Sequence, residues 1–169
     1  MATKKKNLSQ VDHSSLPNAV DFRIAIITSE WNSEVTSALQ QGCMRILKKA
    51  GVKPRNLKLL EVPGTFELPA ATGMLLAAHG SNEYDAIICI GCVIQGETRH
   101  FDFICSAVAT SLAHLGAANA MPVIFGVLTT NTMEQALARA GGKHGNKGVE
   151  AAATALQMIA LAKKLGSTA

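Results

Sequence analysis

The chain has 169 residues, of which 48% are hydrophobic and 17% are charged, so most of it should form one globular domain rather than a disordered segment. The net charge of +4 does not indicate a nucleic-acid partner, because Lys4, Lys5 and Lys6 lie in a polar segment and no basic stripe with interleaved aromatic residues follows. No apolar run reaches the ~18–20 residues of a membrane span and no signal peptide is recognisable, so we expect a cytoplasmic protein that does not contact a membrane.

Residues 1–20 are polar and lack a hydrophobic period, which predicts a flexible basic tail ahead of a single α/β domain over residues 21–169. Short apolar runs predict four buried strands, at residues 23–28, 57–62, 86–94 and 123–128. Helical patterns follow these strands. Ser33 can cap the first helix and Gly51 ends it, the second runs from Pro69 to about His79, and the third runs from His100 to about Leu115. A short helix is predicted over 133–140 and, after a loop over 141–148, a long helix to about Leu165. Strands that alternate with helices pair in parallel through right-handed crossovers. The predicted fold is therefore a three-layer α/β/α sandwich of flavodoxin-like type with a four-stranded parallel sheet.

The cysteines do not indicate a metal or redox site. Cys89 and Cys92 have the spacing of a ligand pair, but residues three apart in a strand point to opposite faces, so their sulfur atoms cannot meet. Cys43 and Cys105 fall in predicted helices without a cysteine or histidine at ligand spacing. We expect four reduced cysteines, mostly buried, and no bound metal.

The turn after the third predicted strand has the features of an anion site beside a proton donor. Gly96 allows a sharp turn, and Thr98 is a candidate N-cap for the next helix. The main-chain N–H groups of Gly96 to Arg99 would then point outward at the positive end of the helix dipole, where a phosphate is favoured. The same dipole disfavours the protonated form of His100, which could therefore take up and return a proton near neutral pH.

Other candidate ligand contacts also follow predicted strands. In open α/β sheets ligands bind outside the carboxyl ends of the strands, and Trp31, residues 64–67, residues 96–100 and residues 129–130 all lie just past those ends. Aromatic residues make up only 4% of the chain, yet Trp31 and Phe66 both fall in these loops. A flat ligand with apolar faces would explain that placement.

Four motifs in order resemble the lumazine synthase family: residues 62–69 (VPGTFELP), 91–102 (GCVIQGETRHFD), 122–129 (PVIFGVLT) and 134–148, which contains EQALARAG and GNKG. The resemblance covers roughly residues 22–165. It implies condensation of 5-amino-6-(D-ribitylamino)uracil with 3,4-dihydroxy-2-butanone 4-phosphate to a lumazine, phosphate and water, without a metal or organic cofactor. Imine formation, loss of phosphate and ring closure require aligned substrates and a proton donor but no electron carrier.

The resemblance also assigns the uracil contacts. Trp31 resembles the residue that stacks on the pyrimidine ring, although it could instead pack on its own loop. Thr65, Phe66 and Glu67 resemble the segment that holds the ribityl chain, and Glu67 could also serve as an acidic residue at a helix N-terminus. Main-chain groups of Cys92, Val93 and Ile94 resemble those that bind the pyrimidine edge. Phe125 lies within a predicted strand and could pack in the core, but the resemblance implies that it covers the ligand of a neighbouring subunit.

The remaining assignments concern phosphate and proton transfer. Glu97 and Thr98 lie where the family binds phosphate, and because like charges repel we expect the Glu97 carboxylate to face solvent. Arg139 resembles the phosphate anchor, with a surface salt bridge to Glu134 or Glu150 as the alternative. Lys147 could add charge there or be an exposed loop lysine. His100 resembles the proton donor, and the chain's other histidines, His13, His79, His114 and His144, are interpreted as structural or solvated.

The family resemblance implies a homo-oligomer with sites between subunits. Pentamers, decamers and 60-subunit shells all occur in the family, and the sequence does not choose among them; an association with riboflavin synthase is also left open. Two readings from other classes compete with the enzyme: a flavodoxin-like module that binds a flavin or lumazine without catalysis, and a shell-forming structural protein. Both predict that His100 and Arg139 are dispensable.

Overall fold

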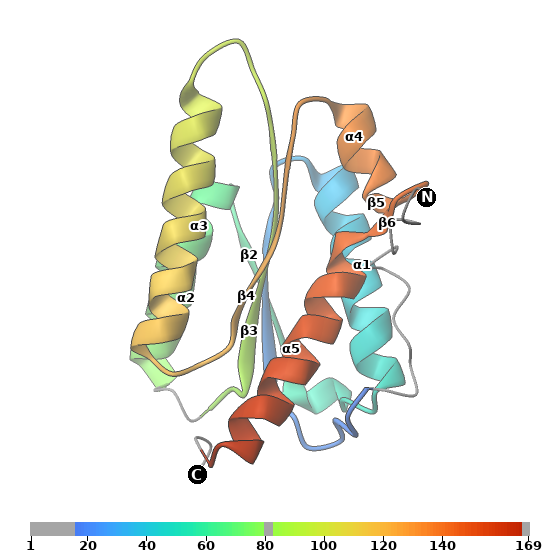
Figure 1. Ribbon diagram of the computed structural model, residues 1–169, viewed down its shortest axis with the longest axis vertical. Coiled ribbons are helices and arrows are strands. Elements are labelled where there is room, and N and C mark those ends of the chain that lie inside the picture. The colour runs from blue at the N-terminus through green and yellow to red at the C-terminus, as the bar shows by residue number, and fades with distance from the viewer. Residues whose placement is uncertain (1–15, 80–82, 167–169) are drawn as a thin grey trace, which may run out of the picture.

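The structure, a computed structural model, describes residues 16–79 and 83–166, which form a sheet between two layers of helices (Figure 1). Residues 1–15 of the predicted tail, which include Lys4 to Lys6 and His13, lie outside the described residues. The elements in chain order are β1 (Ile24–Ser29), α1 (Ser33–Lys49), η2 (Pro54–Asn56), β2 (Leu57–Val62), η3 (Thr65–Glu67), α2 (Leu68–His79), β3 (Ala86–Ile94), α3 (His100–Ala118), β4 (Val123–Thr130), α4 (Met133–Ala138), β5 (Ala140–Gly142), β6 (Gly145–Asn146) and α5 (Lys147–Lys164).

The predicted four-stranded parallel sheet is confirmed, with the strand order β2-β1-β3-β4. Strands β2 and β3 have the predicted bounds, and β4 continues to Thr130. Strand β3 extends beyond the end of β1, because it pairs with β1 only as far as Ile90 but with β4 as far as Ile94. The last residues of β3 therefore have a strand neighbour on one side only, and the candidate site lies on the other side.

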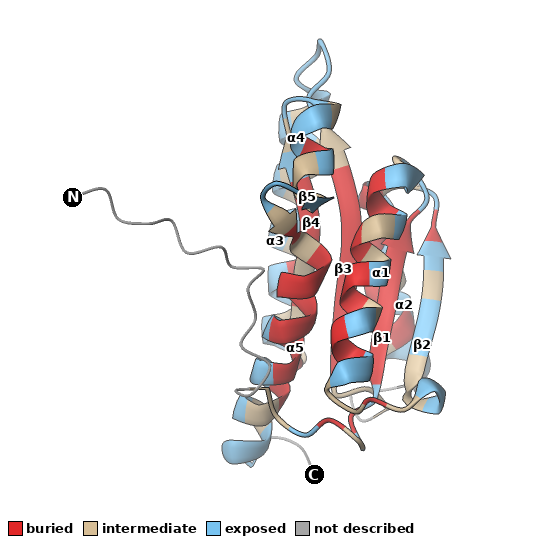
Figure 2. Ribbon diagram, turned by 90° about the vertical axis from the view of Figure 1, so that its right-hand side faces the viewer, coloured by how far each residue is buried: buried red, intermediate tan, exposed pale blue. Residues whose placement is uncertain are grey.

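The core consists of two clusters, one on each face of the sheet. Helices α1 and α5 cover one face and α2 and α3 cover the other (Figure 1), and the buried positions follow these contacts (Figure 2). Neighbouring residues of a strand belong to different clusters, as Ile26 and Ile27 do. The same alternation separates Cys89 from Cys92, so the prediction that their sulfur atoms cannot meet is confirmed.

The folded part of the chain begins earlier than predicted. Ala19 is fully buried, and its main-chain N–H donates to the carbonyl of Ala50 at 2.9 Å. Leu16 packs against the core cluster under α1 and α5. Residues 16–20 therefore belong to the domain, and the prediction that they form part of a flexible tail is wrong, because so short a segment shows no period from which its packing could be recognised.

The start of α1 also differs from the prediction. Ser33 is the first helical residue rather than the N-cap, and the N-cap is Asn32, which has a left-handed backbone with φ 61° and no side-chain hydrogen bond to the helix. Asparagine is one of the few residues other than glycine that adopt this conformation readily. The end of the helix is as predicted, since Gly51 follows it with φ 96°.

The predicted loop over residues 141–148 contains two short antiparallel strands, β5 and β6. Helix α4 accordingly ends at Ala138, before the predicted residue 140, because Ala140 already pairs with Asn146. The side chain of Asn146 accepts hydrogen bonds from the N–H groups of Gly148 and Val149 and donates one to the carbonyl of Ala38. This one residue caps α5 and fixes its first turn against α1.

Helix α3 leaves an apolar face uncovered. Among the described helices it alone is long and apolar enough to cross a membrane by length and composition. However, Asp102 lies in its first turn, and Val108 and Leu112 pack in the core cluster under α2 and α3. It is therefore a covering helix of the sheet, and on its outer face the ring of Phe103 is 72% exposed.

Candidate active site

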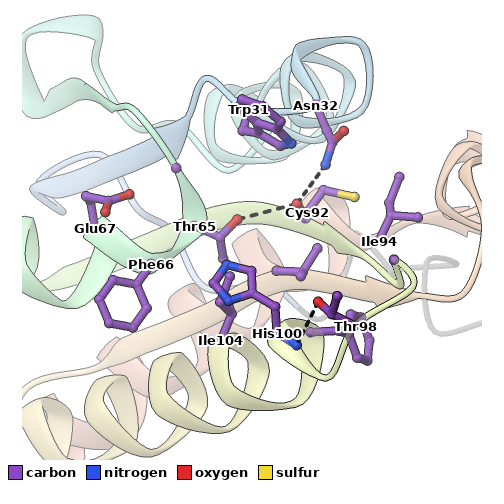
Figure 3. Close-up of a pocket in the computed structure, with 14 residues that line it drawn as sticks. Trp31, Asn32, Thr65, Phe66, Glu67, Cys92, Ile94, Thr98, His100 and Ile104 are labelled. Carbon is purple, nitrogen blue, oxygen red and sulfur yellow. Dashed lines mark hydrogen bonds between the residues drawn. The ribbon is translucent and has the colours of Figure 1, made fainter.

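A cavity of about 460 Å³ lies at the carboxyl ends of the strands, between the loops after β1 and β2, the end of β3 and the first turns of α3 (Figure 3). Parallel strands bring these loops to one edge of the sheet although they are far apart in the sequence. Most of the predicted site residues line this cavity: Trp31, Thr65, Phe66, Glu67, Cys92, Val93, Ile94, Thr98 and His100. The remaining lining residues are Asn32, Gly64, Gly96, Phe101 and Ile104.

The two loop aromatic residues are exposed beside the cavity. Trp31 is 73% exposed and Phe66 57% exposed, values that are high for large apolar side chains. The main chain of the first loop is nevertheless fixed, because the N–H groups of Glu30 and Trp31 donate to the carbonyls of Val62 and Pro63 at 2.8 and 3.1 Å. An uncovered indole on a fixed main chain is suited to stack on a flat ligand.

The carbonyl oxygen of Cys92 joins the two loops to β3. It accepts a hydrogen bond from Asn32 Nδ2 at 3.0 Å and one from Thr65 Oγ1 at 3.5 Å (Figure 3). Thr65 is only 6% exposed, and its hydroxyl also lies 3.4 Å from Ser29 Oγ. The Thr65 hydroxyl therefore holds the loops together, so a ligand in the cavity would meet the main chain of Thr65 rather than its hydroxyl.

The end of β3 presents main-chain groups to the cavity. Successive residues of a strand direct their N–H and C=O groups to opposite sides. The N–H of Gln95 donates to the carbonyl of Thr130 in β4 at 2.8 Å, whereas the carbonyl of Cys92 meets Asn32 on the other side. By alternation, the N–H and C=O of Ile94 point to the same side as the carbonyl of Cys92, beyond the end of β1. An amide donor and a carbonyl acceptor on one residue match the edge of a pyrimidine ring.

The predicted anion turn, residues 96–99, is braced by the preceding glutamine. Gln95 Nε2 donates to the carbonyl of Gly96 at 2.9 Å and lies 3.5 Å from that of Thr98. Within the described residues, the main-chain N–H groups of residues 96–99 donate to no protein acceptor. The turn thus offers donors at the start of α3, a helix of 19 residues, and this arrangement favours an anion.

Two details of this turn differ from the sequence prediction. Gly96 does not have a positive φ, and an added Cβ would meet no atom within 4 Å, so the turn itself does not require glycine. The N-cap of α3 is Arg99 rather than Thr98, and the Thr98 hydroxyl instead accepts from the N–H of His100 at 3.4 Å. His100 begins α3 and its imidazole points into the cavity (Figure 3). The imidazole of His100 therefore lies close to the anion turn over residues 96–99, as the sequence predicts.

Four predicted site residues do not line the cavity: Glu97, Phe125, Arg139 and Lys147. Glu97 is exposed, as we expect for a carboxylate beside a phosphate. Phe125 is half-buried in β4 and packs against the core cluster under α2 and α3, which agrees with its core-packing reading within one chain.

Arg139 and Lys147 lie together on a buried carboxylate. Arg139 Nη2 is 2.8 Å from Glu150 Oε1, and Lys147 Nζ is 3.4 Å from Glu150 Oε2. Arg139 Nη1 also donates to the carbonyl of His144 at 2.9 Å. Within one chain, Arg139 therefore forms the ion pair with Glu150 that the sequence analysis gave as the alternative to phosphate binding. Two cations on one carboxylate still leave a net positive charge at this cluster, which we call the Arg139–Lys147–Glu150 cluster.

Sequence reasoning missed two residues that shape the site, Asn32 and Gln95, and named Glu150 only as an alternative partner of Arg139. The position of Asn32 directly after Trp31 gave one signal, since asparagine tolerates the left-handed conformation. Glu150 follows Lys147 by three residues in a helix, a spacing at which opposite charges meet. Nothing in the sequence around Gln95 indicates that its side chain braces the turn.

The four cysteine side chains are suited to packing rather than to reaction or metal binding. Burial raises the pKa of the Cys92 thiol to about 11 and that of the Cys89 thiol to about 12, and burial also raises the pKa of Cys43. The pKa of Cys105 is raised by burial and by the nearby carboxylate of Asp102. Neutral thiols are poor nucleophiles and poor metal ligands. Over residues 16–79 and 83–166, no group of three or more His, Cys, Asp or Glu residues could hold a metal ion.

Comparison with known proteins gives one consistent result. Residues 21–163 match the model of the 6,7-dimethyl-8-ribityllumazine synthase family. The chain is 50% identical to a protein of that name from Porphyromonas gingivalis over 95% of its own length and 98% of that protein's. It is 45% identical to one from Phocaeicola vulgatus, over 99% and 98% of the two lengths, and 49% identical to one from Cytophaga hutchinsonii, over 95% and 98%.

Proposed function

Because the chain belongs to the 6,7-dimethyl-8-ribityllumazine synthase family, we propose that its cavity condenses 5-amino-6-(D-ribitylamino)uracil with 3,4-dihydroxy-2-butanone 4-phosphate. The products are 6,7-dimethyl-8-ribityllumazine, phosphate and water, in the penultimate step of riboflavin biosynthesis. The observation that carries the residue assignment is the convergence of an exposed indole, an open strand end, an anion turn and an imidazole on one cavity.

The uracil lies between Trp31 and the end of β3. The indole stacks on the pyrimidine face, and the main-chain groups of Cys92, Val93 and Ile94 provide hydrogen bonds to its edge. The ribityl chain extends along Thr65, Phe66 and Glu67, where the Glu67 carboxylate accepts hydrogen bonds from hydroxyl groups. Holding the pyrimidine in this way aligns its 5-amino group with the ketone of the second substrate and lowers the entropic part of the barrier.

The chemistry then consists of proton transfers and the departure of phosphate. The 5-amino group attacks the ketone, a proton reaches the carbinol oxygen, and water leaves to give an imine. Phosphate leaves from C4 as a proton is lost from the adjacent carbon, and the ribitylamino nitrogen closes the ring with loss of a second water. His100 lies beside the anion turn and can donate and accept these protons, while the N–H groups of residues 96–99 and the Thr98 hydroxyl stabilise the departing anion.

A second copy of the chain completes the site. Among the residues that the structure describes, no lysine or arginine lines the cavity, although the second substrate carries a dianionic phosphate. The Arg139–Lys147–Glu150 cluster provides that positive charge from a neighbouring subunit, together with the ring of Phe125. The uncovered apolar face of α3 supports such an assembly, for which a pentamer or a multiple of pentamers is the proposed form.

The substrates and product are small, soluble molecules, so we place the reaction in the cytoplasm. Riboflavin synthase, which would consume the lumazine, is the proposed partner enzyme. Neither assignment affects the roles of the cavity residues.

The function is tested by mixing the purified protein with both substrates and following the absorbance of the lumazine. We expect a rate well above that of the spontaneous condensation, with saturation by each substrate. A rate equal to the spontaneous one, with the pyrimidine still bound, would instead support the non-catalytic binding protein. The same rate without binding would support the structural shell protein.

A further inference from the structure

Asn32 makes an unusual use of its side chain. Asparagine at an N-cap usually accepts a hydrogen bond from the first turn of the helix with its side-chain oxygen, which stabilises the helix. Here the N-cap residue of α1 has a left-handed backbone, with φ 61° and ψ 45°, and its side chain makes no bond to the helix. Its main-chain carbonyl still accepts from the N–H groups of Val35 and Thr36 and from the Thr36 hydroxyl, so Asn32 anchors the helix through its own backbone and not through its side chain.

The side chain is instead directed across the cavity edge to β3. Asn32 Nδ2 donates to the carbonyl of Cys92 at 3.0 Å, a bond between residues that are 60 positions apart (Figure 3). This carbonyl lies beyond the last pairing of β1 with β3, at Thr28 and Ile90, so no strand neighbour is available to satisfy it. The amide of Asn32 thus takes the place of a missing strand partner at the point where β3 enters the cavity.

Two ligand-binding parts of the proposed site meet at this bond. Trp31 precedes Asn32 in the chain, so the position of its indole depends on the backbone of Asn32. Ile94 follows Cys92 by two residues, and its outward N–H and C=O groups depend on where the strand end is held. Without Asn32, the weaker bond from Thr65 Oγ1 to the same carbonyl, at 3.5 Å, would be the remaining hydrogen bond from these loops to the Cys92 carbonyl, so the spacing between the indole and the strand edge would be less tightly set.

We propose that Asn32 is a positioning residue that sets the spacing between the Trp31 indole and the main-chain edge at Ile94, and so determines affinity for the pyrimidine substrate. This inference rests on the proposed function, since it assumes that a pyrimidine ring occupies that space. Asn32 acts through its neighbours and has no role in proton transfer or phosphate binding. It should therefore affect binding of one substrate and leave the chemical step nearly unchanged.

The test uses Trp31 itself as the probe, because the chain has only one tryptophan. The titrant is 5-nitro-6-(D-ribitylamino)uracil, in which a nitro group replaces the attacking amine, so that quenching of the indole fluorescence gives a Kd without reaction. Asn32→Gly keeps access to the left-handed conformation and removes the donor. Asn32→Asp keeps the size of the side chain and places a carboxylate oxygen opposite the Cys92 carbonyl.

Asn56 provides a matched control at the other end of the sheet. Its Nδ2 donates to the carbonyl of Val20 at 3.2 Å, which is also a side-chain amide bond between distant segments. Asn56→Gly and Asn56→Asp therefore report the general cost of losing such a bond. Thermal unfolding of all four variants shows whether each one is folded at the assay temperature.

We expect both Asn32 variants to raise the Kd of the pyrimidine analogue by about tenfold, the factor associated with one net hydrogen bond of ordinary strength. The KM of the aminouracil should rise in parallel, whereas kcat and the KM of the butanone phosphate should change by less than about twofold, as all parameters should in the Asn56 variants. Unchanged pyrimidine Kd in folded Asn32 variants, or equal losses in the Asn56 variants, would overturn the inference. Failure of the proposed function would be seen separately, as absence of turnover in the wild-type protein, whether or not the analogue quenches its fluorescence.

Discussion

Arg139 Nη2 lies 2.8 Å from Glu150 Oε1, and the side chain of Glu150 is only 8% exposed. A buried carboxylate requires a partner, and its two cationic neighbours, Arg139 and Lys147, hold it in place while retaining a surplus positive charge. The planar guanidinium is therefore oriented in advance by Glu150 and by the carbonyl of His144. In the proposed assembly this orientation directs the remaining donors of Arg139 toward the phosphate of a substrate in a neighbouring subunit.

Replacement of Arg139 should affect the phosphate substrate selectively. Arg139→Ala removes charge-assisted hydrogen bonds, and Arg139→Lys keeps the charge but loses the planar fork, so we expect the KM of the butanone phosphate to rise by roughly tenfold or more in the first and by less in the second. Steady-state kinetics with each substrate varied in turn measures both effects, and Arg45→Ala, on the exposed side of α1, is the control. Normal saturation by the butanone phosphate in Arg139→Ala would count against the phosphate assignment.

Mixing two impaired variants should raise activity above that of either one if the site is shared between subunits. Subunits with His100→Ala keep the Arg139 cluster, and subunits with Arg139→Ala keep the cavity. After unfolding and refolding of an equal mixture, about a quarter of the interfaces of a closed ring should pair an intact cavity with an intact cluster. Activity that stays at the level of the separately refolded variants would show that each site is built from one chain.

Loss of the imidazole should slow turnover without weakening substrate binding. We expect His100→Ala to lower kcat by at most ~10²–10⁴-fold, the usual contribution of a general acid–base group. The decrease can be smaller, because the condensation proceeds unaided once both substrates are held together. Single-turnover measurement of lumazine formation tests this, and His114→Ala, an exposed histidine of the same helix, should retain wild-type kcat. Equal losses in the two variants would assign His100 a structural role.

Asn146 should contribute more to stability than an ordinary capping residue. Asn146→Ala removes two capping bonds of α5 and the bond to the carbonyl of Ala38, so we expect the free energy of unfolding to fall by about 1–3 kcal/mol. Urea denaturation measures this change. Asn119→Ala, which removes one bond to Leu115 at the end of α3, should cost less. A smaller loss for Asn146→Ala than for Asn119→Ala would mean that the contact between α5 and α1 does not depend on this side chain.

The thiols of the folded protein should be unreactive near neutral pH. The pKa of Cys92 is raised to about 11 and that of Cys89 to about 12, so both are neutral at pH 8 and become thiolates only as the pH rises toward those values. Titration with a chromogenic disulfide at pH 8 should detect at most a slow reaction of the partly exposed Cys105, and all four cysteines after denaturation. Cys105→Ser should remove the slow phase, and a rapid reaction of Cys92 would contradict its burial.

The same pKa directions predict how stability changes with alkaline pH. A thiol whose pKa is higher in the folded than in the unfolded state stabilises the fold fully below its unfolded pKa of about 8.5. That stabilisation is lost as the pH rises through the folded value, which for Cys92 is about 11. Each buried thiol therefore adds to a loss of stability that begins above roughly pH 9, and Cys92→Val should reduce this alkaline loss.

The sequence alone determined the order and type of the five α-helices and of the four strands of the main sheet. Strands such as 86–94 are continuous apolar runs and α1 has a helical period, so local patterns were sufficient to predict a parallel sheet with helices on both faces. The position of the cavity also followed, because loops that come after parallel strands must gather at one edge. Local patterns failed where the chain is short or its pairing is irregular, as at residues 16–20 and in the β5–β6 hairpin.

Only the tertiary structure decided which side chains act together. Asn32 meets the carbonyl of Cys92 from 60 positions away, and Thr65 holds the same carbonyl rather than turning its hydroxyl to the cavity. Arg139 and Lys147, which the family resemblance places with the phosphate, gather on Glu150 outside the cavity of their own chain. Hydrophobic period reports which face of an element is buried, but the partner of a polar side chain depends on distances that arise only when distant segments pack.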